Sequence, residues 1–576
     1  MAKRAITAIF FFILAIACTR VTSVRLNGWY ACGTPSVSKG VALPAPSFEC
    51  AMVTMPLCHP GVCTSNQTIE VFVKRLLPSP ASTVQAARAR SMWALQGGPG
   101  VSSSNMESQL TAMWEATNGS IHAYTLDVRG AGRSTFLDCE AAQAQTAASP
   151  ASTRIAPEEF SSCFRDLLFK YDNQMVAFST TSAALDLAFL IKELTGDTDA
   201  YVYGASYGTY WAQRLMHVAP SNVKGYILDG VVSTKSYRFS SWNDNIVAPT
   251  KRLIDACAND TFCKSKFAPL LQATNGSLEK AFQTILTKLD SAAPGKNPCA
   301  DFFRSQIGAG IKVPVSTQLR YVLEWRARGN TRVFVPAFLY RASRCNTQDL
   351  AFLKKYANYN FAPAKVIDKI KDRSELLFKL VKFSELWAIP ETPLSTHRAR
   401  DNSSILRYNL TEETIEYCLY SGRHEEPACQ EATARVAQPY YNTTPRLTYD
   451  VDQYHGKTAT LPNGVSVLLI NGRLDMNTPA EFGEEQFATY NTTNKLLLQF
   501  KYGGHCTGMA GTTDQDHTKC TDKIMASFLL NDGQTSKVES GCMKNLPPLE
   551  FHNKNSVARL FSKMTDVYEG NVSTTA

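Results

Sequence analysis

The fold is decided by residues 200–208, which read Ala200-Tyr201-Val202-Tyr203-Gly204-Ala205-Ser206-Tyr207-Gly208. The first four residues form an apolar, aromatic run that predicts a buried strand. The pattern G-x-S-x-G follows directly, and residues 210–218 then show helical spacing. Small residues flank Ser206, as a sharp strand-to-helix turn requires, because the serine backbone is strained there and its Oγ must stand clear of the sheet. The stretch therefore predicts a nucleophilic serine at Ser206.

Outward from this turn, short apolar runs alternate with helical patterns. Strands are expected at residues 92–95, 123–126, 200–203, 225–228, 465–470 and 495–500, and helices at 183–194, 210–218, 480–489 and 523–530. Strands that alternate with helices indicate a mostly parallel sheet with helices on both faces, the α/β class.

The alternation stops for about 220 residues in the middle of the chain. This middle part is mostly helical in pattern and rich in aromatic residues, which favours one large insertion above the sheet. Length alone would allow several domains, but a single fold with an insertion fits as well. The expected division is a first core part at 24–234, a cap at 235–455, a second core part at 456–535 and a C-terminal extension at 536–576.

A nucleophilic serine needs a base and a residue that orients the base. Asp475 and His505 each follow a predicted strand, in the order acid then histidine that this strand–turn–helix motif requires. The carboxyl ends of parallel strands meet at one sheet edge, so both should lie near Ser206. We expect His505 to take the serine proton and Asp475 to hold the imidazole. Asp229, after the strand that follows Ser206, is the rival acid.

A serine hydrolase also needs two backbone N–H donors for the oxyanion. One is expected from Tyr207 and the other from Gly97, in the glycine-rich loop 96–100. A second glycine-rich loop, residues 127–134, lacks the phosphate-binding pattern, so its basic groups are predicted to form structural pairs.

The N-terminus predicts export. Lys3 and Arg4 precede an apolar run that ends in Ala15-Ile16-Ala17, which is typical of a signal peptide at residues 1–17, cleaved between 17 and 23. Sixteen cysteines agree with an oxidising compartment. The close pairs Cys257–Cys263 and Cys418–Cys429 are disulfide candidates, and we expect the group Cys32, Cys50, Cys58 and Cys63 to pair as well. Zinc is the weaker alternative for Cys58 and Cys63, because no His or Cys pair follows at zinc spacing.

Nine N-x-S/T sequons predict a glycoprotein of the secretory pathway, at Asn66, Asn118, Asn259, Asn275, Asn402, Asn409, Asn442, Asn491 and Asn571. The net charge of +9 is mild for 576 residues and shows no block of like charges, so no nucleic-acid partner is expected. No second apolar run is long enough to span a membrane. We expect neither a cofactor nor a metal, and the oligomeric state is left open.

These motifs together resemble the prolyl and tripeptidyl aminopeptidase family of serine peptidases, over residues 90–234 and 460–530. The resemblance rests on Gly97-Gly98-Pro99-Gly100, Asp127-x-Arg129-Gly130-x-Gly132-x-Ser134, Gly204-x-Ser206-x-Gly208, Gly472-x-x-Asp475-x-x-Thr478-Pro479 and Gly504-His505. It implies an α/β-hydrolase fold with a large helical cap, and an exopeptidase that acts on peptide N-termini. One departure is Gln96, where the family commonly has histidine; it leaves the oxyanion backbone intact but alters the contacts of the loop.

Two other function classes fit the same residues. A secreted esterase or lipase would use the same triad without recognising an amine, and a catalytically silent binding protein could keep the fold, although such proteins usually lose the serine or the histidine. An exopeptidase needs a group that binds the substrate ammonium. Glu385, beside aromatic residues in the predicted cap, is the first candidate for this role, and Glu324 is the second.

Overall fold

The computed structural model describes most of the chain. Its described residues are 25–35, 46–144, 146, 148–149, 155–307, 313–357, 372–401, 404–433, 444–509, 515–552 and 566–570. The predicted signal peptide, Cys18 and the sequons at Asn402, Asn442 and Asn571 lie outside the described residues.

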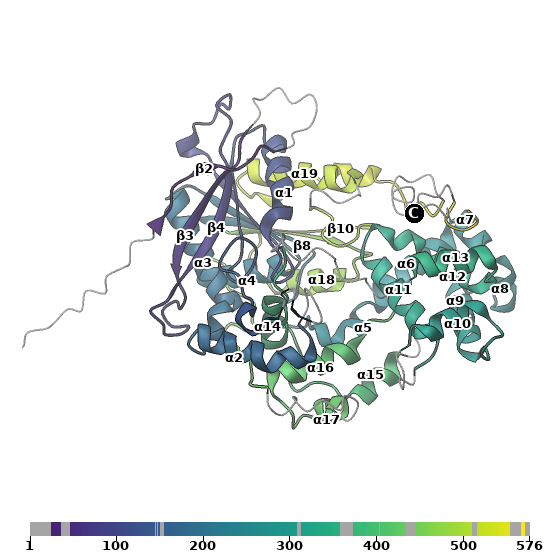
Figure 1. Cartoon of the computed structure of the whole chain (residues 1–576). Coiled ribbons are helices and arrows are strands. Elements are labelled where there is room, and N and C mark those ends of the chain that lie inside the picture. The colour runs from purple at the N-terminus through teal and green to yellow at the C-terminus, as the bar shows by residue number, and fades with distance from the viewer. Residues whose placement is uncertain are drawn as a thin grey trace, which may run out of the picture.

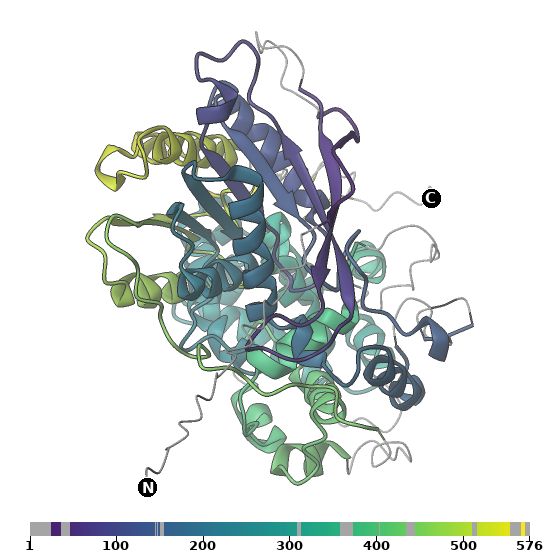
Figure 2. The same ribbon diagram turned by 90° about the vertical axis from the view of Figure 1, so that its left-hand side faces the viewer.

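One twisted sheet organises the core, and its described strands follow the order β1-β3-β4-β6-β5-β7-β8-β9-β10, with β2 paired to β3. The strands are β1 Arg25–Leu26, β2 Tyr30–Ala31, β3 Glu49–Pro56, β4 Thr68–Leu76, β5 Ser91–Leu95, β6 His122–Leu126, β7 Ala200–Ala205, β8 Val223–Asp229, β9 Ser466–Gly472 and β10 Lys495–Phe500. All pairs from β6 to β10 are parallel, whereas the N-terminal strands pair antiparallel and form the purple edge of the sheet in Figures 1 and 2.

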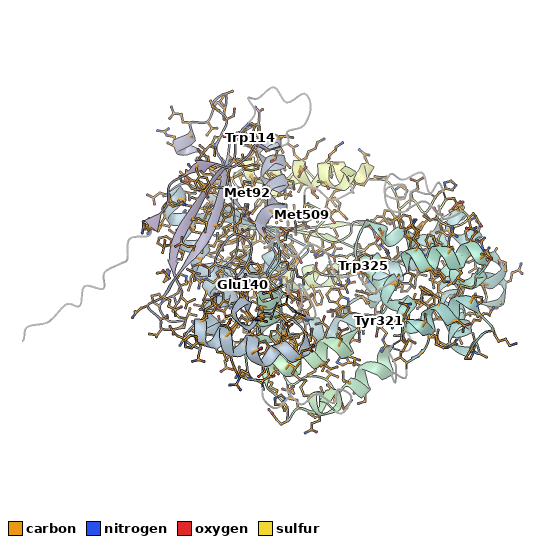
Figure 3. The ribbon with its side chains drawn as sticks, viewed as in Figure 1. Met92, Trp114, Glu140, Tyr321, Trp325 and Met509 are labelled. Atoms are coloured by element: carbon orange, nitrogen blue, oxygen red, sulfur yellow. A yellow bond between two sulfur atoms is a disulfide. The ribbon has the colours of Figure 1, made fainter. Side chains whose placement is uncertain are left out.

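Side chains of the strands alternate between two apolar cores, one on each face. On β5, Met92 packs in the core that contains Trp114, whereas its neighbour Trp93 packs in the other core. Figure 3 labels Met92 and Trp114 in the first of these. This first core is covered by α1 (Met106–Ala116) and α19 (Gln515–Leu530), and the second by α3 (Thr180–Thr195), α4 (Tyr207–Val218) and α18 (Ala480–Thr489). The prediction of a mostly parallel sheet covered on both faces is confirmed.

The described residues between β8 and β9 form helices and loops, with no strand among them. In order, its helices are α5 Trp242–Asn245, α6 Val247–Asn259, α7 Thr261–Ser265, α8 Ala268–Ala273, α9 Leu278–Ser291, α10 Pro298–Ser305, α11 Ser316–Arg328, α12 Val335–Arg344, α13 Thr347–Tyr356, α14 Glu375–Glu385, α15 Leu394–Asp401, α16 Leu410–Ser421 and α17 Pro427–Thr433. Figure 1 shows α6 to α13 gathered beside the sheet and α15 to α17 below it. The remaining helix, α2 (Phe160–Lys170), lies before α3 in the chain.

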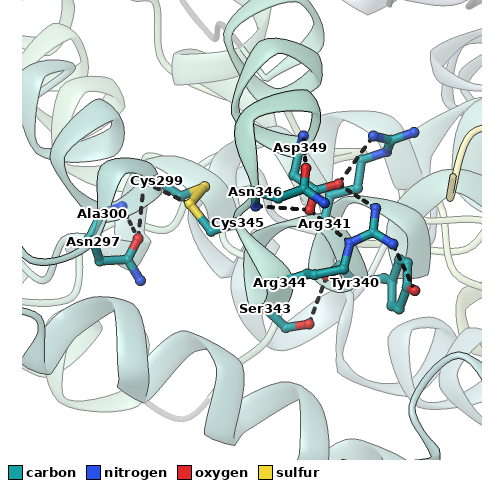
Figure 4. The surroundings of a disulfide bond; sticks show 10 residues. All are labelled: Asn297, Cys299, Ala300, Tyr340, Arg341, Ser343, Arg344, Cys345, Asn346 and Asp349. Carbon is teal, nitrogen blue, oxygen red and sulfur yellow. Dashed lines mark hydrogen bonds and ion pairs between the residues drawn. A yellow bond between two sulfur atoms is a disulfide. The ribbon is translucent and has the colours of Figure 1, made fainter. Parts of the chain in front are cut away.

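The helices α10 to α13 are joined by a disulfide and by ion pairs. Cys299 and Cys345 form a disulfide, and Asn346 caps α13 in a reciprocal capping box with Asp349 (Figure 4). The Asp349 carboxylate also accepts hydrogen bonds from two arginines of α12, Arg341 and Arg344. A buried carboxylate with two guanidinium partners has its lone pairs satisfied, which is the condition for a buried ion pair to be retained.

Residues 566–570 of the C-terminal extension pack against these same helices. Arg341 donates hydrogen bonds to the carbonyls of Val567 and Gly570, at 2.6 and 2.8 Å. Tyr568 is almost fully buried between aromatic rings that include Phe262. The sequence left open how this extension packs, because the partners lie more than 200 positions away in the chain.

Two features of the core differ from the sequence prediction. The antiparallel strands β3 and β4 were not among the expected elements, although Val53 and Met55 of β3 show the period-two burial of a strand. Helix α19 begins at Gln515 rather than near residue 523, because its first two turns are polar and lack an apolar repeat.

No described helix is long and apolar enough to cross a membrane.

Seven disulfides join fourteen of the cysteines: Cys32–Cys50, Cys58–Cys63, Cys139–Cys163, Cys257–Cys263, Cys299–Cys345, Cys418–Cys429 and Cys520–Cys542. The structure thus contains the pairs Cys257–Cys263 and Cys418–Cys429, and it pairs the N-terminal group two by two. Among the described cysteines only Cys506 is free, and it is buried. The described residues contain no cluster of His, Cys, Asp and Glu that could hold a metal ion.

This cysteine pattern predicts the outcome of thiol counting. Protein unfolded without a reductant should react at one thiol, Cys506, or at two if Cys18 is retained. Reduction should lower the free energy of unfolding markedly, because closure of the 46-residue Cys299–Cys345 loop alone is worth about 4 kcal/mol in chain entropy. Thiol titration and thermal unfolding with and without reductant measure both effects. Finding most cysteines free would contradict the disulfide map and the export prediction.

Candidate functional site

Ser206 occupies the turn between β7 and α4. Its backbone has φ 56° and ψ −124°, a conformation that L-residues rarely adopt. Its N–H donates to the carbonyl of Asp229 at 2.9 Å, which fixes the turn against the end of β8. A side chain on Gly204 would lie 2.3 Å from the carbonyl oxygen of Gly208, and one on Gly208 would lie 2.4 Å from that of Leu95. The G-x-S-x-G pattern therefore exists because both flanking positions have no room for a Cβ atom.

His505 and Asp475 are hydrogen-bonded to each other. The His505 Nδ1 lies 3.0 and 2.9 Å from the two Asp475 carboxylate oxygens. The Asp475 side chain is fully buried and accepts further hydrogen bonds from the backbone N–H groups of Asn477 and Thr478 and from the Thr478 hydroxyl. These contacts fix the carboxylate, which in turn places the proton on Nδ1 and leaves Nε2 free to accept one.

The charge of Asp475 affects the basicity of His505. Burial alone would lower the pKa of His505, but the Asp475 carboxylate opposes this by attraction and by hydrogen bonding, and the net pKa lies above its usual value. An imidazole with such a partner is more ready to accept a proton and to carry the resulting charge.

The loop of His505 lies against the Ser206 turn. Cys506, the next residue, donates its Sγ–H to the carbonyl of Asp229 at 3.5 Å, the same carbonyl that accepts the Ser206 N–H. A Cβ atom on Gly230 would be 3.0 Å from both Cys506 Sγ and Thr478 Oγ1. The structure therefore brings the three predicted residues to one sheet edge, at the carboxyl ends of β7, β9 and β10, and places Asp229 at the end of β8 between them.

Gly97 lies directly beside the serine. A Cβ atom on Gly97 would be 2.8 Å from Ser206 Cβ and 3.4 Å from its Oγ, so only glycine allows this approach. The Gly97 N–H donates to the side-chain oxygen of Gln96 at 3.1 Å. Tyr207 is the first residue of α4, where backbone N–H groups have no partner within the helix. Both predicted oxyanion donors thus flank Ser206.

Segments between β8 and β9 contact the loops that follow β5 and β10. Residues 372–374 bridge the loop after β5: Ser374 N–H donates to Gly100 O at 2.9 Å, and Ser102 N–H donates to Asp372 O at 2.6 Å. Arg332, in the short helix Asn330–Phe334, donates to Tyr502 O at 2.8 Å, three residues before His505. The positive charge of Arg328, on α11, opposes protonation of His505. Sequence reasoning missed these residues because nothing local links them to distant loops.

Glu385 is buried in an ion pair. It is 3% exposed, and its carboxylate accepts hydrogen bonds from Thr180 N–H at 2.9 Å, Tyr449 O–H at 2.7 Å and Arg214 at 3.4 Å. Glu324 is 1% exposed and is held by Arg328 and by the indole N–H of Trp242, each at 2.7 Å. Both carboxylates already have hydrogen-bond partners within the protein, so neither has an unpaired oxygen that a substrate ammonium would need to satisfy. The contacts favour structural roles for both, and amine recognition by either stays a prediction.

The second glycine-rich loop is built from structural pairs, as predicted. Asp127 accepts hydrogen bonds from Ser103 N–H and Arg133 N–H, both at 2.6 Å. Arg129 is fully buried and forms a two-point ion pair with Asp186 at 2.6 Å.

Of the described sequon asparagines, Asn409 is partly buried and the others are exposed: Asn66, Asn118, Asn259, Asn275 and Asn491.

Comparisons with known proteins bear on the fold. A family model described as alpha/beta hydrolase fold matches residues 95–261. The solved structures that match include a serine hydrolase from Cycloclasticus zankles (12% identity, TM-score 0.30, 84% of this chain and 98% of that chain), an esterase from Exiguobacterium antarcticum (12%, 0.29, 80% and 96%) and an epoxide hydrolase from Vigna radiata (11%, 0.29, 80% and 95%). No curated protein matches. The chain has the α/β-hydrolase fold, as its sequence predicts.

Proposed function

We propose that this protein is a secreted serine hydrolase, an exopeptidase that cleaves peptide bonds near free N-termini through an acyl-enzyme on Ser206. The observation that carries the proposal is the shared sheet edge: the strained Ser206 turn and the loop of His505 bond to the same Asp229 carbonyl, and His505 is hydrogen-bonded to a buried aspartate. Seven disulfides and exposed sequons support the secretory part.

The geometry supports a two-step acyl transfer. Ser206 Oγ attacks the substrate carbonyl while His505 Nε2 takes the hydroxyl proton, and Asp475 stabilises the imidazolium that forms. The N–H groups of Gly97 and Tyr207 stabilise the oxyanion, which replaces Gln96 as the acceptor of the Gly97 N–H. His505 then returns the proton to the leaving amine. Water, activated by the same histidine, hydrolyses the acyl-enzyme and regenerates Ser206.

The motif resemblance favours a peptidase over the alternative, a carboxylesterase or lipase with the same triad. The test is a substrate panel assayed with purified protein and with a Ser206→Ala control: aminoacyl, prolyl and tripeptidyl amides, their N-acetylated forms, and short acyl esters. The proposal expects hydrolysis of free-amine amides at a kcat/KM at least tenfold above that of the acetylated forms. Turnover of esters alone would assign the protein to the esterases. Absence of all turnover would favour the silent binding protein.

The substitution Glu385→Gln distinguishes a structural carboxylate from one that binds the substrate amine. Because Arg214, Tyr449 and Thr180 already satisfy Glu385, we expect the change to lower the free energy of unfolding by about 1–3 kcal/mol, the cost of an unpaired buried partner. Hydrolysis of free-amine and N-acetylated substrates should fall by the same factor. A ten- to hundredfold loss confined to free-amine substrates would instead make Glu385 the amine-binding residue.

A further inference from the structure

Asp229 contacts both loops of the proposed catalytic site but has no role in the acyl-transfer steps. It is the last residue of β8 and is fully buried. Its main-chain carbonyl accepts the Ser206 N–H at 2.9 Å and the Cys506 Sγ–H at 3.5 Å. The backbone of Asp229 is therefore a common anchor for the nucleophile and for the residue next to the base.

The side chain of Asp229 makes a second connection to the histidine loop. Its Oδ2 accepts the Gly508 N–H at 2.9 Å and the Tyr203 O–H at 3.0 Å. A Cβ atom on Gly508 would lie 3.0 Å from Oδ2, so the loop approaches closely here. The other oxygen, Oδ1, is buried and has no hydrogen-bond partner among the described residues. A carboxylate with one oxygen unpaired in the interior is poorly stabilised in its charged form.

Asp229 lies among ionisable groups from three elements. Tyr203 faces it from β7, Asp475 from the loop after β9, and His505 and Cys506 from the loop after β10. Burial raises the pKa of Asp229 to about 7, against the opposing effects of the Tyr203 hydrogen bond and the His505 charge. The negative form of Asp229 raises the pKa of His505, as Asp475 does more strongly, while Arg328 on α11 lowers it.

We propose that Asp229 is a positioning residue for His505: its main-chain carbonyl and its carboxyl group anchor the histidine loop against the Ser206 turn, and they do so beside the imidazole as a buried acidic group. The proposal rests on the proposed function of Ser206 and His505. Unlike Asp475, Asp229 makes no hydrogen bond to the imidazole among the described contacts.

The sign of the pH effect follows from the charges. In the wild type, ionised Asp229 favours protonated His505. As the pH falls, His505 therefore becomes protonated, and stops acting as a base, at a higher pH than it would without the Asp229 charge. The two groups titrate as a coupled set. Asp229→Asn removes the negative charge permanently but keeps a carbonyl oxygen for Gly508 and Tyr203. His505 should then remain a free base to lower pH, and the acid limb of the reaction should move to lower pH.

The test measures the rate at which a fluorophosphonate labels Ser206 as a function of pH, because this rate reports the serine–histidine pair without needing the natural substrate. On the alkaline plateau, Asp229→Asn should label within about tenfold of wild type. On the acid limb, the ratio of variant to wild-type rate should rise about three- to tenfold above its plateau value. Asp522→Asn is the matched control, since Asp522 on α19 also has its pKa raised to about 7 by burial but is not among the charges that shift the pKa of His505.

Three outcomes are informative. An unchanged pH profile for folded Asp229→Asn, or the same change for Asp522→Asn, overturns the proposal. If Asp229→Asn does not fold, Tyr203→Phe takes its place: it removes a hydrogen bond that favours the ionised form of Asp229, so the acid limb should move in the same direction, and an unchanged limb overturns the proposal. Wild-type protein that never labels contradicts the proposed function itself, which separates that failure from this one.

Discussion

Replacing Ser206 by alanine should reduce turnover by about four to six orders of magnitude, because the remaining groups of a catalytic triad provide little rate acceleration without the nucleophile. The backbone at φ 56° is as accessible to alanine as to serine, and alanine removes only the Oγ atom, so the fold should be kept. The measurement is kcat on the best amide of the substrate panel, with circular dichroism and thermal unfolding as controls for the fold. A folded Ser206→Ala protein that retains more than a few per cent of the activity would show that another residue is the nucleophile.

Asp475→Asn should cost about four orders of magnitude in kcat, the second large effect. The asparagine amide would present an N–H group to His505 Nδ1, which favours the tautomer with its proton on Nε2, and such a histidine cannot accept the serine proton. Asn477 and Thr478 would retain one acceptor oxygen, so the loop should keep its position.

The matched control for this prediction is Asp229→Asn, whose plateau activity we expect to stay within about tenfold of wild type because Asp229 does not bond the imidazole. Single-turnover kinetics of both variants on one substrate give the ranking directly. If Asp229→Asn were the more damaging change, Asp229 would be the catalytic acid and the assignment of Asp475 would be wrong.

Sequence reasoning predicted the parts of the fold that local signals determine. The runs at β9, β10 and α18 have the apolar spacing of their elements, and the boundaries of α18 and β10 coincide with the predicted ones. The positions of Ser206, Asp475 and His505 could be predicted because each follows a recognisable strand. In a parallel sheet, the carboxyl ends of neighbouring strands lie at one edge, so order along the chain becomes proximity in space.

What the sequence could not predict depends on partners that are far apart in the chain. Glu385 looked like a free carboxylate because its partners Arg214 and Tyr449 are 171 and 64 positions away. The contacts of residues 372–374 with the loop after β5 bridge an even longer separation, and no periodicity records them. Tertiary contacts of this kind decide whether a polar side chain serves the fold or the substrate.

Gln96 illustrates how one departure from a motif gains meaning only in the structure. Its side-chain oxygen accepts the N–H of Gly97, which is one of the two proposed oxyanion donors. A histidine at this position would offer a ring nitrogen in place of the amide oxygen that accepts the Gly97 N–H here. The sequence could identify the departure, but only the hydrogen bond shows that Gln96 and the oxyanion would compete for the same donor.

The most direct test of the central claim is the site at which a fluorophosphonate reacts. Trypsin releases residues 193–214 as one peptide, and Ser206 is its only serine. Mass spectrometry of the labelled, digested protein should place the phosphonate on this peptide in the wild type and find none after heat denaturation before labelling. A label on any other peptide, or active protein that hydrolyses substrate while residues 193–214 stay unmodified, would contradict the account.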